Sequence, residues 1–114
     1  MDQLIANIAA STGVDRGVAH KAVAIILGFL NREGPADKVG ALIDGLPGAR
    51  ALADEAPAGG SGVMGVFNDL TQAGLGMGEV QQATREFVAF AKANVGEDTV
   101  NDVVRAIPGL NQFV

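Results

Sequence analysis

The sequence predicts an all-α fold in which two tandem three-helix repeats pack as one pseudo-symmetric helical domain. Apolar residues recur at three- and four-residue intervals along the chain, which is the spacing of helix faces. The alternation and β-branched clusters typical of strands are absent. The repeat is predicted by shifting the sequence by 61 positions, which places residues 5–53 on residues 66–114 without a gap and gives nine identical pairs.

The length of 114 residues suits a single domain. Within it we expect repeat one at residues 4–55, a glycine-rich linker at residues 56–62 and repeat two at residues 63–114. Neither repeat is large enough to bury its apolar faces alone, so the two are expected to pack against each other. Only five residues are aromatic, although 48% of the chain is hydrophobic, which predicts an aliphatic core.

Each repeat is predicted to contain a short first helix and a long central helix. The central helices span roughly residues 15–33 and 76–95, and Gly13 and Gly74 are expected to end the helices before them in left-handed conformation. The inward positions of the central helices are Val18 or Ala19, Ala22, Ile26 and Phe29 in the first repeat, and Val80, Ala83, Phe87 and Phe90 in the second.

The third helix of each repeat is predicted from apolar residues at i, i+3, i+4 and i+7, and each runs into a Pro-Gly step, at residues 47–48 and 108–109. A similar step opens the turn of helix-hairpin-helix DNA-binding motifs. Both copies lack the second glycine of such motifs, and Arg50 is the only cation near either copy. We therefore interpret the steps as helix terminators. A further short helix is predicted at residues 49–55.

Composition excludes several functions. The net charge of −5 repels nucleic acids and anionic membranes, and the eight basic residues are scattered. Without cysteine the chain has no disulfide, thiolate nucleophile or cysteine-ligated metal. The longest apolar run, residues 22–30, is far shorter than the roughly 20 residues of a membrane-spanning helix, and the acidic start is unlike a secretory signal. We expect a cytoplasmic protein with no membrane span and no nucleic-acid partner.

His20 is the only histidine and therefore the first candidate for acid–base or metal chemistry. Asp15, Arg16 and Lys21 lie near it along the same predicted helix. The repeat places Gln81 at the corresponding position, which is typical of a solvated face, and no cluster of ligands has metal-site spacing. We predict a surface histidine, with no catalytic residue, no cofactor, no metal site and no enzymatic activity.

The two central helices differ on their outward sides. Residues 84–86 (Thr-Arg-Glu) are polar, whereas Val23 and Ile25 lie at corresponding positions in the first repeat, and Leu30 corresponds to Ala91. A helix that is apolar all round is expected to be buried on every side. Its cover is either another segment of the same chain or a second protein molecule. Val23, Ile25 and Leu30 are therefore the candidate partner-binding residues.

Three stretches carry a resemblance to a known group: EGPADKVGALIDGLPGA (residues 33–49), GLGMGE (residues 74–79) and GEDTVNDVVRAIPGL (residues 96–110). Through them the chain resembles small uncharacterised helical proteins of bacteria and is similar to VcgC/VcgE-type domains of unknown function. The resemblance covers nearly the whole chain. Its motifs are turns and helix faces, so it implies a helical fold but no activity.

The sequence favours a non-enzymatic helical interaction module that self-associates as a homodimer or docks a protein partner through the apolar face of the first central helix. The alternative is a carrier of a small apolar or lipid-like ligand in a pocket between the two repeats. Small residues at helix contacts, including Gly28 opposite Ala89, favour such a pocket.

Overall fold

A computed structural model describes residues 2–55 and 62–107 of the chain, and most of these residues are helical. No strand occurs in this part of the chain, which confirms the predicted all-α fold class. The helices are α1 (Asp2–Thr12), α2 (Arg16–Glu33), α3 (Ala36–Asp44), α4 (Ala49–Glu55), α5 (Gly62–Gln72), α6 (Met77–Val95) and α7 (Glu97–Ala106).

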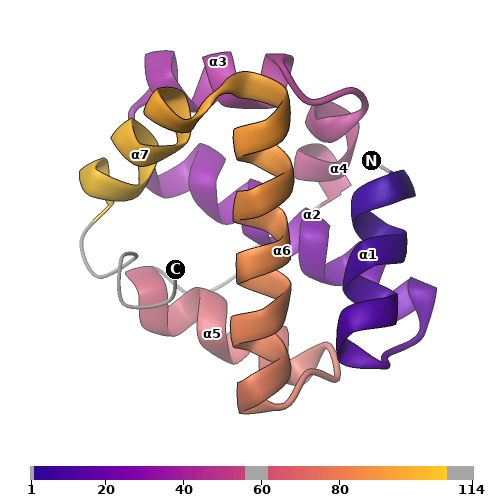
Figure 1. Cartoon of the computed structure of the whole chain (residues 1–114). Helices are drawn as coiled ribbons and strands as arrows, with labels where there is room; N and C mark the ends of the chain where they lie inside the picture. Colours follow the sequence, from indigo (N-terminus) through magenta and orange to yellow (C-terminus); the bar gives the residue numbers. More distant parts are fainter. Residues whose placement is uncertain (1, 56–61, 108–114) are drawn as a thin grey trace.

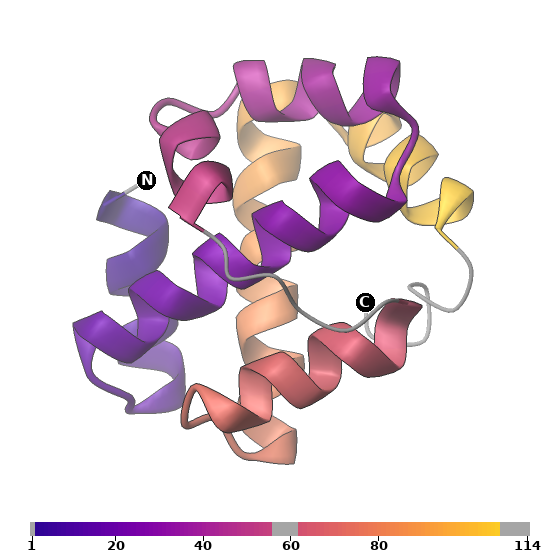
Figure 2. The same ribbon diagram turned by 180° about the vertical axis from the view of Figure 1, so that it is seen from behind.

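Helix α2 runs through the middle of the molecule and packs against α1, α3, α4, α5 and α6 (Figures 1 and 2). Every residue from 22 to 30 is buried, as the all-round apolar composition of this stretch predicts. Burying one aliphatic side chain contributes about 1.5–3 kcal/mol, so this stretch makes a major contribution to the stability of the core.

The other long helix, α6, crosses α2 and buries only one face (Figure 1). Its buried positions recur every three or four residues, while the residues between them, such as Gln81 and Arg85, are exposed. The buried residues are Val80, Ala83, Thr84, Phe87 and Ala91.

The shorter helices join the two halves of the chain. Helix α1 packs against both α2 and α6, and α5 packs against the same two long helices. Helices α3 and α7 pack against each other beside them, at the upper end of the view in Figure 1. The buried residues consequently form one core that draws on both halves of the sequence.

Glycines end α1 and α5 as predicted. Gly13 has a φ of 79° and Gly74 a φ of 117°, both in the region that favours glycine. Helix α6 then begins with a side-chain cap, because the backbone N–H of Gly76 donates to Oε1 of Glu79 over 2.7 Å. Helix α3 ends at Asp44, before the first Pro-Gly step, whereas residues 108–109 lie outside the described residues.

The structure corrects the predicted position of Thr84 and adds detail at two other places. Thr84 is predicted to face outward but is only 8% exposed. Its hydroxyl group has a hydrogen-bond partner inside the helix, because it donates to the backbone oxygen of Val80 over 2.8 Å. Phe90, predicted to point inward, packs against the core but is only partly buried. Gly62, the last residue of the predicted linker, is the first residue of α5, and residues 56–61 lie outside the described part of the chain.

The turn after α1 gives a direct test of the fold. Gly13→Ala is expected to lower the free energy of unfolding by about 1–2 kcal/mol, because an added Cβ meets no atom there and the cost comes from the positive φ. Gly40→Ala is the matched control: this glycine lies in open space inside α3, so alanine is expected to stabilise by about 0.5–1 kcal/mol. Urea unfolding followed by circular dichroism measures both. A neutral Gly13→Ala would contradict the left-handed turn.

Candidate functional site

The three candidate partner-binding residues are buried within the chain. Val23 is 0% exposed, Ile25 is 7% exposed and Leu30 is 3% exposed. Helices α4 and α5 pack against α2 and supply cover from the same chain (Figure 2). Of the two kinds of cover that the sequence left open, an intramolecular one is therefore present. A role of these residues in binding a partner stays a prediction.

An apolar groove lies among α5, α6, α7 and the C-terminal half of α2 (Figure 1 shows these helices). It has a volume of about 50 Å³. Leu30 contributes to its wall, whereas Val23 and Ile25 do not. The described lining residues are Ile26, Phe29, Leu30, Leu42, Val66, Phe67, Leu70, Val80, Thr84, Phe87, Val88, Val100, Val103 and Val104.

The described lining of the groove is almost entirely apolar. Thr84 is the only polar side chain in its described lining, and the Thr84 hydroxyl already donates to the Val80 backbone oxygen. Phe67, Val88 and Val104 are partly buried, so the apolar lining continues toward the surface. Because burying an unpaired polar group costs several kcal/mol, such a lining selects against polar occupants and for apolar ones.

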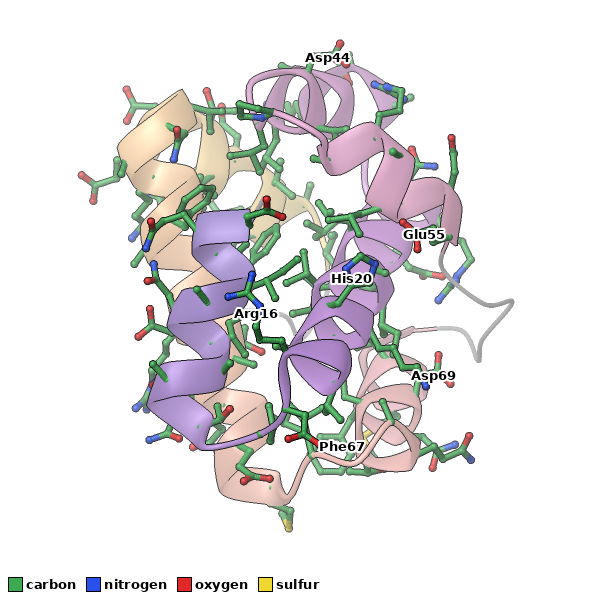
Figure 3. The ribbon with its side chains drawn as sticks, turned by 90° about the vertical axis from the view of Figure 1, so that its right-hand side faces the viewer. Arg16, His20, Asp44, Glu55, Phe67 and Asp69 are labelled. Atoms are coloured by element: carbon green, nitrogen blue, oxygen red, sulfur yellow. The ribbon has the colours of Figure 1, made fainter. Side chains whose placement is uncertain are left out.

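A second hollow contains His20, which the sequence predicted to lie on the surface. Nε2 of His20 lies 3.1 Å from Oε1 of Glu55, at the end of α4, and the two side chains are 42% and 55% exposed (Figure 3). The hollow is an open cleft of about 620 Å³. Its described lining residues are Gly17, His20, Lys21, Ala24, Ile25, Glu55, Asp69, Gln72 and Ala73.

The pairing of His20 with Glu55 escaped sequence reasoning, because the partner is 35 residues away and on another helix. An acidic partner in a cleft is the arrangement that acid–base chemistry would require. The described lining, however, contains no serine, threonine or cysteine that the imidazole could activate. The pair links α2 and α4 through a solvent-exposed contact, and contacts of this kind contribute at most about 1 kcal/mol.

Some of the other described charges also form pairs. Arg50 donates to Oδ1 of Asp44 over 2.7 Å, and this hydrogen bond and the charge of Asp44 raise the pKa of Arg50. The cation beside the first Pro-Gly step is thus engaged within the chain, in keeping with a helix terminator. Lys38 lies 3.5 Å from Asp102 and links α3 to α7. Among the described residues, no group of three or more acidic or histidine side chains could hold a metal ion.

No described helix combines the length and apolar character needed to cross a membrane. No protein-family model matches the chain, and no curated protein or solved structure matches it either. The resemblance to VcgC/VcgE-type domains thus stays a prediction, and the function rests on the geometry of the groove and of the covered face of α2.

The substitution Ile25→Glu tests whether α2 is covered by its own chain or by a second molecule. Because Ile25 is buried within the chain, a glutamate there is expected to lower the free energy of unfolding by about 2–4 kcal/mol. Asn31→Glu, at an exposed position of the same helix, is the control and is expected to change it by less than about 0.5 kcal/mol. Urea unfolding and sedimentation are measured together. If Ile25→Glu leaves stability unchanged and splits a wild-type dimer, a second molecule supplies the cover.

Proposed function

We propose that this protein is a non-enzymatic helical binding module that takes up an apolar group in the groove among α2, α5, α6 and α7. The observation that carries this proposal is the described lining of the groove, in which Thr84 is the only polar side chain and has its hydroxyl already bonded. Apolar walls of this kind are typical of sites for small apolar ligands. The groove draws on both halves of the chain, as the sequence-based alternative of a carrier requires.

The volume of the groove favours a small occupant. A water-sized group needs roughly 10–15 Å³ of such volume, so about 50 Å³ accommodates three or four groups. A short stretch of an alkyl chain or one apolar side chain meets this requirement. Each buried methylene contributes about 0.8 kcal/mol, so the groove as described supplies about 3 kcal/mol, and a longer occupant has to bury further surface at the mouth.

We further propose that the chain consists of two tandem three-helix units, α1–α3 and α5–α7. Corresponding helices have similar lengths: 11 and 11 residues, 18 and 19, and 9 and 10. The packing partners also correspond, because α1 lies on α6 as α5 lies on α2, and α3 lies on α7. The positive φ angles of Gly13 and Gly74 add a matched turn. These features support a duplicated unit with an approximate two-fold relation.

Docking of a protein partner or a second copy through α2 is less well supported. Val23 and Ile25 are covered by their own chain, and only Leu30 of the three candidate residues reaches the groove. A partner that uses Leu30 would have to insert an apolar side chain into the groove. Such insertion would draw on the same carbon surface as an alkyl chain, so the groove is the common element of both functions.

Binding of a fluorescent polyene fatty acid tests the proposal. The chain has no tryptophan or tyrosine, so its own fluorescence does not obscure the probe. The wild type is expected to bind cis-parinaric acid, and Val104→Asp is expected to weaken binding at least tenfold, because a carboxylate enters the apolar lining. Met64→Asp, at a 74% exposed position outside the described lining, is the control and is expected to leave affinity unchanged.

Val104→Phe provides a second variant that carries no charge. The larger side chain is expected to fill part of the groove and to weaken probe binding while helicity, measured by circular dichroism, is retained. Equal affinity for the wild type, Val104→Asp and Val104→Phe would place the probe elsewhere and overturn the proposed site. The same conclusion would follow if the wild type bound no probe.

A further inference from the structure

The charged residues of α6 are sorted onto two sides of the helix. Arg85 and Lys92 lie three residues before and four residues after Val88, so all three share one side. Val88 is partly buried and lines the apolar groove. Glu79 and Glu86 lie together on another side, because Glu86 is two residues, or about 200°, from Val88. The side of α6 that borders the groove therefore carries basic residues and no acidic one.

Helix α7 adds a third basic residue beside the groove. Val103 is buried, Val104 is partly buried and Arg105 is exposed, so three consecutive residues lead from the wall of the groove to a cation at the surface. Helices α6 and α7 pack against each other (Figure 1). The eight basic residues are scattered along the sequence, but all three that belong to α5, α6 and α7 thus flank one groove.

The carboxylates of these helices are placed elsewhere. None of the ion pairs among the described residues includes one of the three basic residues. Asp102 pairs instead with Lys38 of α3, and Asp69 of α5 lines the other cleft. Glu97 and Asp98 begin α7, roughly 10–12 Å along the helix axis from its last turn. The cations beside the groove are therefore available to an anion from outside the described chain.

The first half of the chain has no such set of cations. The 61-residue shift places an uncharged or acidic residue at each of the three positions, where the corresponding residues are Ala24, Asn31 and Asp44. Ala24 is buried under its neighbours, in keeping with the complete cover of α2. Basic residues thus occupy these positions only in the half that leaves an apolar groove at the surface.

We propose that the ligand of the groove is an amphiphile with an anionic head group, in the simplest case an alkyl chain that ends in a carboxylate. The alkyl chain lies against the apolar lining, and the carboxylate is bound at the mouth by Arg85 and Lys92, with Arg105 close by. This inference rests on the proposed function, because it names the class of ligand that the same groove takes up.

The two kinds of surface suit the two parts of such a ligand. Lys92 is half-buried, and a lysine can lay its four-carbon stem along apolar surface while its ammonium group stays in water. An ion pair at an exposed site strengthens binding by up to about fivefold, so two or three pairs select for an anionic head group. The apolar lining offers the head group itself no partner, which keeps the carboxylate at the mouth and directs the alkyl chain inward.

Two probes with the same tail separate the contributions of head group and tail. cis-Parinaric acid carries a carboxylate, whereas its methyl ester is neutral. A purely apolar site is expected to bind the ester at least as tightly, because the ester has no charge to desolvate. We expect the wild type to bind the acid about fivefold or more tightly than the ester in a fluorescence titration. Equal or tighter binding of the ester overturns the head-group site and leaves the proposed function standing, whereas binding of neither probe overturns both.

The double variant Arg85→Gln/Lys92→Gln identifies the cations. Glutamine keeps helix propensity and removes the charge, so the preference for the acid is expected to disappear while affinity for the ester changes by less than about twofold. Arg16→Gln removes an exposed cation of α2 outside the described lining and is the control that keeps the preference. Circular dichroism verifies that the variants are folded. A preference for the acid that survives the double variant, or that Arg16→Gln also abolishes, overturns the assignment of the head group to this mouth.

Discussion

The structure depends on covering one helix that is apolar on every side. Nine consecutive residues of α2, from 22 to 30, are buried, and no single neighbour could cover them all. Five helices share this task, and two of them, α5 and α6, come from the second half of the chain. Neither half could keep α2 out of water alone. Much of the apolar surface whose burial drives folding is therefore buried where the two halves meet. Helix α6 has a polar face and needs less cover, which makes the two halves unequal.

Helix positions and ends could be predicted because they follow from local sequence. The three- and four-residue spacing of apolar side chains marks the helix faces, and Gly13 and Gly74 end helices as expected for left-handed C-caps. Thr84 was misplaced because residue type alone suggests solvent, whereas a threonine in a helix can satisfy its hydroxyl on the preceding turn. The pairing of His20 with Glu55 depends on how α4 lies on α2, which no local pattern contains.

Comparing the two halves of the sequence predicted that their central helices differ in polarity. It could not predict where the apolar groove lies. The apolar stretch of α2 indicated surface in need of cover, and the structure supplies that cover through α4 and α5. The described apolar groove lies instead beside α6 and α7, whose sequences read as ordinary amphipathic helices. Whether a helix face is buried depends on which neighbouring helices pack against it as well as on its own residues. An amphipathic helix can therefore border a groove while an apolar helix is fully packed.

The small size of the groove limits how it can bind. About 3 kcal/mol from three or four buried groups falls short of the 4.1 kcal/mol that corresponds to a dissociation constant of 1 mM, so the groove alone holds a free ligand weakly. One methylene more or less changes the free energy by about 0.8 kcal/mol, which discriminates poorly between chain lengths. A free ligand therefore has to bury surface beyond the groove, and the partly buried Phe67, Val88 and Val104 provide the nearest carbon for it.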